Sequence, residues 1–250
     1  MFRDKLLYYL ANYTFQHNFE KEIAKLIKDK KKIVIFDVGC YRGAFTKNIF
    51  NLIRKSKCKF YLFDINKKVK KYISNLTRFK NINYNEIALS NKNGVANYNY
   101  NSFFESAGSS LSNIVKNDNR WNFSRKLILK ALFFKTDSFI KYQVRTITLD
   151  SFVKKNKIRS IDILKIDIEG SEYELFKGAK NALKTNKIKI ILVEIIDKKK
   201  YHKIKEKKIL DMLKKRNFVL IKKAKILSIS MFSNIKGGDY LFINSKHLKS

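Results

Sequence analysis

Short apolar runs alternate with amphipathic stretches along most of the chain. Runs rich in β-branched and aromatic residues predict strands, at residues 32–38, 60–63, 82–87, 161–167, 188–196, 218–221 and 240–243. Apolar residues three or four positions apart predict helices, at residues 2–30, 44–55, 66–76, 172–184 and 202–215. Because the strands alternate with helices, the pattern predicts βαβ units and an α/β fold with an open, mostly parallel sheet.

The middle of the chain breaks this alternation. After a turn signal at 91–94, apolar and polar residues alternate over 95–100, which is typical of a hairpin arm. Residues 101–142 combine a polar stretch with a helical pattern at 121–134, and we interpret them as an insertion that faces the substrate. A further short strand is expected at 144–149.

No internal repeat or linker divides the chain further. We therefore expect a helical N-terminal segment over residues 1–30 and one domain over residues 31–250, which is long enough for a full hydrophobic core. The longest clean apolar run, 188–196, is shorter than the roughly 18 residues that span a bilayer, and the N-terminus lacks the pattern of a signal peptide. A cytoplasmic protein is the expectation.

The charge admits two interpretations. Lys and Arg number 55 and Asp and Glu number 21, so the formal net charge is +34. One interpretation is a basic surface for a polyanion, either nucleic acid or an anionic membrane to which the protein binds peripherally. The other is the codon bias of a low-GC genome, because Lys, Asn, Ile, Phe and Tyr abound, Pro is absent and the lysines are spread along the chain.

The turn after the first predicted strand is a candidate binding site. Gly39 and Gly43 permit backbone conformations that other residues avoid, and they let a ligand approach the main chain where a helix begins. The Gly-x-x-x-Gly spacing matches neither the dinucleotide fingerprint nor the Walker loop. An adenosyl ligand with a cationic sulfonium and no pyrophosphate fits better, and Asp37 supplies a nearby carboxylate. A plain strand-to-helix turn is the alternative.

Acids also follow two other predicted strands. Asp64 ends the second strand, where an acid can accept hydrogen bonds from both ribose hydroxyls, although a helix N-cap is the alternative. Asp167 and Glu169 lie at the end of the strand at 161–167, on the edge where α/β sheets bind ligands. Buried carboxylates beside a cleft are costly unless they serve a cation, a hydrogen-bond donor or proton transfer.

These residues resemble the FkbM-type S-adenosylmethionine-dependent methyltransferases. The resemblance covers about residues 33–194 and, more weakly, 240–244. Its motifs are, in chain order, Phe36-Asp37-Val38-Gly39 with Gly43 and Thr46, Phe63-Asp64, Ala88-Leu89-Ser90 with Gly94, Ser109-Ser110-Leu111, Thr146 to Asp150, Leu164 to Glu172, Leu175 to Ala179, and Val193-Glu194. Two positions depart from the family pattern: Cys40-Tyr41 replaces the usual Ala-Asn, and Asp64-Ile65 replaces the usual Glu-Pro.

The resemblance implies a class I methyltransferase fold. This fold is Rossmann-like, with a mostly parallel sheet flanked by helices and an antiparallel last strand. The implied cofactor is S-adenosylmethionine, and the implied acceptor is a hydroxyl of a sugar or glycan, which can be nucleotide- or lipid-linked. The cofactor site would contain Asp37, Gly39, Gly43, Asp64 and Ala88.

A sugar hydroxyl loses a proton during methylation, and a carboxylate within hydrogen-bond reach can accept it. We expect Asp167 to be this base and Glu169 to be the second candidate. Lys165 is expected to stabilise a developing oxyanion, although a place on the face of the sheet is the alternative. A divalent metal held by Asp167, Glu169 and Glu194 is the less favoured option, because no His is near them.

Two other functions stay open. An RNA 2′-O-methyltransferase would use the basic charge, together with Lys165, Asp167 and Glu194. A non-catalytic binding protein with the same sheet would explain Cys40-Tyr41 as a decayed pocket. One basic stripe at the mouth of the cleft would favour RNA, whereas scattered lysines would favour a glycan. The oligomeric state has no signal in the sequence.

Overall fold

Two sheets form the centre of the described part of the protein. The structure is a computed structural model, and it describes residues 19–28, 30–53, 57–101, 109–111, 139–198, 202–225 and 235–247. Among these residues, the larger sheet has seven strands in the order β3-β2-β1-β7-β8-β10-β9, and the smaller sheet has the order β4-β6-β5. The strands are β1 (Lys32–Val38), β2 (Lys57–Phe63), β3 (Ile82–Asn85), β4 (Ala88–Leu89), β5 (Gly94–Asn101), β6 (Phe139–Ile147), β7 (Ile161–Ile166), β8 (Ile188–Lys198), β9 (Phe218–Lys225) and β10 (Ile235–Asn244). The helices are α2 (Phe19–Leu26), α3 (Ala44–Leu52), α4 (Val69–Tyr72), α6 (Leu149–Lys155), α7 (Glu172–Lys177), α8 (Lys180–Lys184), α9 (His202–Lys214) and the 3₁₀ helix η1 (Ser245–His247).

The larger sheet is parallel apart from its last strand. Among the described strands, β1 pairs in parallel with β2 and β7, β2 with β3, and β7 with β8, whereas β10 is antiparallel to both β8 and β9. The strand order reverses between β1 and β7, and α/β proteins bind ligands beyond the carboxyl ends of the strands at such a point. The predicted Rossmann-like α/β fold with an antiparallel last strand is confirmed.

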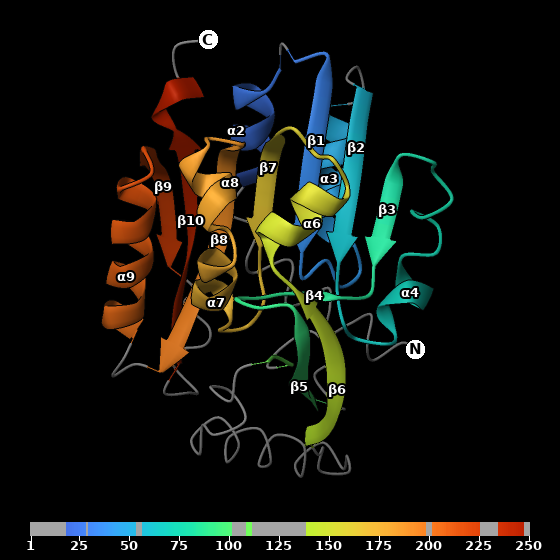
Figure 1. Ribbon diagram of the computed structural model, residues 1–250. Helices are drawn as coiled ribbons and strands as arrows, with labels where there is room; N and C mark the ends of the chain where they lie inside the picture. The colour runs from blue at the N-terminus through green and yellow to red at the C-terminus, as the bar shows by residue number, and fades with distance from the viewer. Residues whose placement is uncertain are drawn as a thin grey trace, which may run out of the picture.

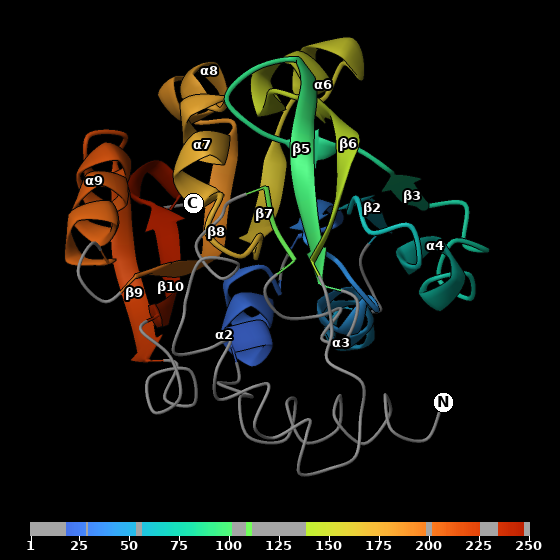
Figure 2. The same ribbon diagram turned by 90° about the horizontal axis from the view of Figure 1, so that it is seen from below.

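Helices cover both faces of the larger sheet (Figure 1). Helices α6 to α9 lie on one face and α2 and α3 on the other, as Figure 2 shows from below. Along β7, Leu164 and Ile166 enter the core beneath α6 to α9, and Ile163 enters the core beneath α2 and α3. Because side chains alternate along a strand, Lys165 points to the face of α2 and α3. The smaller sheet lies beyond the carboxyl ends of β1, β2 and β7 (Figure 1).

Several predicted elements differ from the observed ones: the strands expected at 60–63, 218–221 and 240–243 are longer, and three other elements change more. The strand expected at 144–149 was wrong at both ends: β6 begins at Phe139 because it pairs with β5 along its length, and Leu149 instead starts α6. The helix expected at 66–76 shortens to α4, because the side chains of Asp64 and Asn66 accept hydrogen bonds from the backbone N–H groups two residues on and hold turns before it. The helix expected at 172–184 divides into α7 and α8.

Gly178 is the C-cap of α7, at the break between α7 and α8. A Cβ at this position would lie 2.0 Å from the carbonyl oxygen of Ser90, so the chain needs glycine where the helical layer meets the segment after β4. The backbone of Gly178 also accepts a hydrogen bond from Asp150 N at 3.1 Å, and the carboxylate of Asp150 accepts hydrogen bonds from the first two amides beyond Lys180, those of Asn181 and Ala182. Helices α6, α7 and α8 therefore pack together at this break.

Parts of the expected domain organisation fall outside the described residues. Of the N-terminal segment 1–30, the structure describes α2 and the turn after it; of the insertion 101–142, it describes the two ends and residues 109–111. The helical pattern at 121–134 lies outside, so these domain boundaries stay predictions. Within the described ranges, no helix is both long and apolar enough to cross a membrane.

Asp162 ties the amino ends of the strands together. Its carboxylate is almost fully buried and accepts hydrogen bonds from Lys30 Nζ at 3.0 Å, Lys189 Nζ at 2.6 Å and Val34 N at 2.8 Å. Burial alone would raise the pKa of Asp162, but these three donors outweigh burial and lower it.

Replacing Asp162 with asparagine should therefore destabilise the fold by about 2 kcal/mol at pH 7, since it leaves two half-buried lysines without their shared anion. Because the folded pKa lies below the unfolded one, this stabilisation is present above the unfolded pKa and disappears as the pH falls through the folded pKa. Urea unfolding should show a large difference between wild type and variant at pH 7 and a progressively smaller one as the pH falls below the ordinary pKa of 3.8. A difference that does not change with pH would contradict this role of Asp162.

Candidate functional site

The turn after β1 is bonded to the end of β2. Gly39 N and Cys40 N both donate to the carbonyl oxygen of Phe63, at 2.9 and 3.2 Å, and Tyr41 N donates to Asp64 Oδ2 at 2.8 Å. Gly39 and Tyr41 have positive φ values of 77° and 41°, so the chain turns tightly here. The structure thus brings together the glycine turn and the acid that the sequence assigns to one cofactor site.

Both glycines of this turn meet close packing within the chain. A Cβ on Gly39 would lie 1.7 Å from the carbonyl oxygen of Asp167, because the turn crosses the loop after β7. Gly43 has a φ of 70° and precedes α3, and a Cβ there would lie 2.5 Å from Leu76 Cδ1. Leu76 therefore occupies the space beside Gly43, and contacts of either glycine with a cofactor stay predictions.

Asp37 lies beneath the turn, inside the protein. Its side chain is fully buried, its Oδ2 accepts a hydrogen bond from Thr46 Oγ1 at 2.7 Å, and its Oδ1 lies 3.5 Å from Lys165 Nζ. Burial raises the pKa of Asp37, and the charge of Lys165 and the hydrogen bond from Thr46 offset only part of that rise. Any influence of Asp37 on a sulfonium would therefore act from below the site, and this role stays a prediction.

Lys165 joins the turn after β1 to the loop after β7. Its Nζ donates to the carbonyl oxygen of Gly39 at 3.0 Å and to Asp167 Oδ2 at 3.1 Å. Burial alone would lower the pKa of Lys165, but the charges of Asp167 and Asp37 outweigh burial and raise it. Lys165 therefore stays charged, and its expected role at an oxyanion stays a prediction.

Three carboxylates form a row at the carboxyl edge of the sheet. Ile166 of β7 pairs with Val193 of β8, and Glu194 of β8 pairs with Asp239 of β10. Asp167, which follows β7, therefore lies in one row with Glu194 of β8 and Asp239 of β10 across three neighbouring strands. A hydrogen bond joins Asp167 to Glu194.

The members of this row differ in pKa. Burial and the charge of Asp167 raise the pKa of Glu194 well above its ordinary value. Burial would also raise the pKa of Asp167, but Lys165 and the hydrogen bond with Glu194 outweigh burial and lower it. Burial and the Asp167 charge raise the pKa of Asp239 to about 7. Burial therefore favours the protonated form of Glu194, whereas Lys165 favours the ionised form of Asp167.

Replacing Asp239 with asparagine should stabilise the protein more at pH 8 than at pH 5. The folded pKa of about 7 exceeds the ordinary value of 3.8, so the folded state holds a proton that the unfolded chain releases, and stability falls as the pH rises through this interval. The variant should avoid this loss, which is about 1–2 kcal/mol once partial exposure and the neighbouring charges are considered. Urea unfolding at both pH values measures the effect, with the exposed Asp211→Asn as the matched control. Equal gains at both pH values would argue against it.

The loop after β7 carries Glu169 in a strained backbone conformation. Glu169 and Gly170 have φ values of 52° and 100°. Ser110 packs on this loop: its side chain is buried, and its Oγ donates to the carbonyl oxygen of Ile168 at 3.1 Å and lies 3.3 Å from Ser171 Oγ. Part of the insertion is thus held against the loop that carries the candidate bases.

The other end of the site is built around Asp64. Its Oδ1 accepts a hydrogen bond from Asn66 N at 3.0 Å, and burial raises its pKa although Asn66 N and Tyr41 N oppose the rise. Tyr142 OH donates to the carbonyl oxygen of Ile65 at 3.2 Å, which anchors β6 over this end. Asn66 is only 3% exposed, and among the described residues its Nδ2 has no hydrogen-bond partner. A buried donor without an acceptor is costly, which is typical of a site that a ligand completes.

Ala88 was expected at the cofactor site from the family resemblance. It is buried in β4, where it pairs with Thr146 of β6, so it lies at the junction between the larger and the smaller sheet. Contact with a cofactor therefore stays a prediction for this residue. No group of three or more His, Cys, Asp or Glu side chains in the described part of the chain is arranged to hold a metal ion.

Sequence reasoning missed Asp239 and Asn66. For Asp239 a signal existed, because an acid after Gly237 and Gly238 precedes the apolar stretch of the last strand. Asn66 had no usable signal, since asparagine is frequent throughout this chain.

Comparisons with known proteins point to one family. A model of the FkbM methyltransferase domain matches residues 37–220. No curated protein matches the chain significantly. Among solved structures, methyltransferase FkbM from Methylobacillus flagellatus KT is 10% identical with a TM-score of 0.49, and the alignment covers 85% of this chain and 44% of that one. TrmK from M. capricolum, solved with S-adenosyl-homocysteine, is 15% identical with a TM-score of 0.43, and the alignment covers 90% and 67%. The chain thus spans less than half of the M. flagellatus protein.

Proposed function

Because the chain belongs to the FkbM methyltransferase family, we propose that it transfers a methyl group from S-adenosylmethionine to a hydroxyl group of a sugar or glycan. The observation that carries this proposal is the convergence of three elements at the carboxyl edge of the sheet. The turn at Gly39 is hydrogen-bonded to the end of β2, Tyr41 N donates to Asp64, and the same turn touches the backbone of Asp167.

The residues around Asp64 fit the adenosine part of the cofactor. Backbone N–H groups, among them those of Tyr41 and Asn66, donate to the Asp64 carboxylate. A carboxylate has about four lone-pair sites, so Asp64 keeps acceptor capacity for a ribose hydroxyl. The buried Nδ2 of Asn66, which lacks a partner among the described residues, offers a donor beside it. When bound, S-adenosylmethionine supplies an electrophilic methyl group on a sulfonium cation.

Asp167 is the proposed acceptor of the hydroxyl proton. Its side chain is 39% exposed, so an acceptor molecule can reach it, and its lowered pKa keeps it ionised at neutral pH. Lys165 and Glu194 hold its orientation through hydrogen bonds. A carboxylate of lowered pKa is a weak base, so we expect most of the rate enhancement to come from positioning and the rest from proton transfer.

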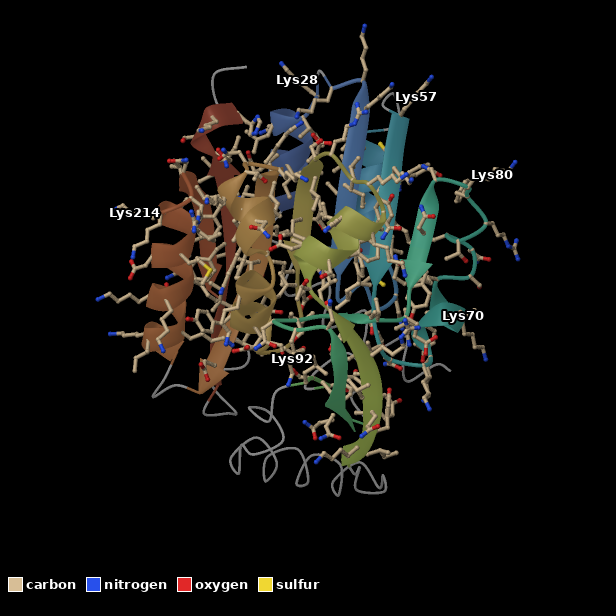
Figure 3. The ribbon with its side chains drawn as sticks, in the orientation of Figure 1. Lys28, Lys57, Lys70, Lys80, Lys92 and Lys214 are labelled. Atoms are coloured by element: carbon tan, nitrogen blue, oxygen red, sulfur yellow. The ribbon has the colours of Figure 1, made fainter. Side chains whose placement is uncertain are left out.

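The charge distribution supports a sugar acceptor over RNA. Figure 3 shows the labelled lysines Lys28, Lys57, Lys70, Lys80, Lys92 and Lys214 on different sides of the molecule rather than in one stripe. The net charge of +34 is the observation that favours RNA, so RNA belongs among the acceptors to be tested.

The test is a transfer assay with S-adenosylmethionine labelled on its methyl group. The panel contains nucleotide sugars, lipid-linked glycans and RNA transcripts. We expect label on a sugar hydroxyl of one of the first two classes. Label on an RNA ribose would overturn the acceptor class, and absence of both transfer and S-adenosylhomocysteine binding would favour a non-catalytic protein. A cytoplasmic location and contact with an anionic membrane remain proposals.

A further inference from the structure

A buried ion pair lies behind the loop that carries the candidate bases. Glu172 begins α7 and Lys205 lies on α9, and their side chains are 1% and 10% exposed. Lys205 Nζ lies 2.9 Å from Glu172 Oε2. The same ammonium donates to the carbonyl oxygens of Gly170 at 2.7 Å and of Ile196 at 2.9 Å. Two of the three N–H donors of Lys205 thus reach backbone carbonyl oxygens, and its charge faces the Glu172 carboxylate.

The ion pair binds both backbone polar groups of Gly170, its N–H and its carbonyl oxygen. Gly170 N donates to Glu172 Oε1 at 2.6 Å, while the carbonyl oxygen of Gly170 accepts from Lys205. Gly170 and its neighbour Glu169 are the two consecutive residues of this loop with positive φ values. A non-glycine residue such as Glu169 keeps this conformation only where the surroundings enforce it.

We propose that Glu172 and Lys205 are positioning residues that hold the loop from Asp167 to Gly170 in the shape that presents its carboxylates to the acceptor. This inference rests on the proposed function and deepens it. Neither side chain is placed to touch the substrate, since both are buried behind the loop. Their effect on transfer would pass through Gly170 to Glu169 and Asp167.

Stability alone does not account for this arrangement. Two charges buried together repay their desolvation only with good geometry, and a hydrophobic pair of similar volume often stabilises a fold as well or better. The ion pair is directional, however, and from a side chain on α9 and one at the start of α7 it reaches backbone atoms of two further elements, the loop after β7 and strand β8. Hydrophobic residues would fill the space without fixing the Gly170 peptide.

The test compares Lys205→Met and Glu172→Gln, singly and combined, with Lys223→Met as the matched control. Lys223 of β9 also forms an ion pair with a residue of α9, Glu206, but that pair is more exposed, at 40% and 16%. Hydrogen exchange of the Gly170 amide reports directly whether Glu172 and Lys205 hold this residue. We expect each variant of the pair to accelerate this exchange about tenfold or more, and the control to leave it unchanged. The double variant should resemble the single ones, because the two residues act as one unit.

Methyl transfer is then measured with the acceptor on which the wild type is most active. We expect Lys205→Met to lower kcat about tenfold or more while KM for S-adenosylmethionine changes less than about threefold, because the cofactor end of the site is untouched. Unchanged exchange at Gly170, or accelerated exchange with a wild-type kcat, would overturn the inference. A wild type that methylates nothing in the panel would instead overturn the proposed function. The exchange measurement would still decide whether Glu172 and Lys205 hold the loop.

Discussion

Replacing Gly39 with alanine should abolish cofactor binding and destabilise the fold by about 3–5 kcal/mol. The expected loss has two causes. The backbone at Gly39 has a φ of 77°, which L-residues rarely adopt, and the new Cβ would lie 1.7 Å from the carbonyl oxygen of Asp167. Backbone atoms cannot turn aside like a side chain, so the turn after β1 and the loop after β7 would have to separate.

Gly94 offers a matched control for this prediction. It also has a positive φ, 140°, but a Cβ there would meet nothing within 4 Å. Gly94→Ala should therefore cost only the backbone strain, about 1–2 kcal/mol, and leave cofactor binding intact. Urea unfolding and calorimetric titration with S-adenosylhomocysteine measure both effects. If Gly39→Ala behaves like Gly94→Ala, the close approach of the two loops is not what the fold or the site requires.

Replacing Asp167 with asparagine should lower kcat by about 10²–10⁴-fold, with little change in the affinity for S-adenosylmethionine. Asparagine keeps the shape of the side chain but cannot accept the hydroxyl proton. Because Lys165 and Glu194 lower the pKa of Asp167, the wild-type rate should stay level as the pH falls and drop only below the ordinary carboxyl range.

Glu169→Gln is the companion variant, because Glu169 is the second candidate base on the same loop. We expect Asp167→Asn to lose far more activity than Glu169→Gln. Retention of full turnover by Asp167→Asn together with loss in Glu169→Gln would move the role to Glu169. Retention in both variants would show that neither carboxylate accepts the proton.

The fold was predictable because its central strands are buried on both faces. Runs such as 161–166 and 188–196 are largely apolar and β-branched, which is typical of central strands in a parallel sheet. The predicted ends of elements were wrong where tertiary contacts determine them. Phe139 joins β6 only through its pairing with β5, and this pairing leaves no local trace in the sequence. Gly178, between α7 and α8, is visible in the sequence, but its close approach to Ser90 is not.

The site was predictable where its residues follow strands directly. Asp64 and Asp167 end apolar runs, so their place at one edge follows from the parallel sheet alone. The supporting residues were not predictable in this way. Lys205 is one of several lysines on α9, and only the structure shows that its side chain is buried against Gly170. Asp239 belongs to the antiparallel strand, whose register with β8 brings it beside Glu194.

The cofactor site at the carboxyl edge is tested most directly by calorimetric titration with S-adenosylhomocysteine, for the wild type and for Asp64→Ala. We expect saturable binding by the wild type and a loss of about tenfold to a hundredfold in affinity for the variant, since charge-assisted hydrogen bonds to the ribose would be removed. A wild type that releases no heat, or a variant that binds as tightly as the wild type, would contradict the assignment of this edge as the cofactor site.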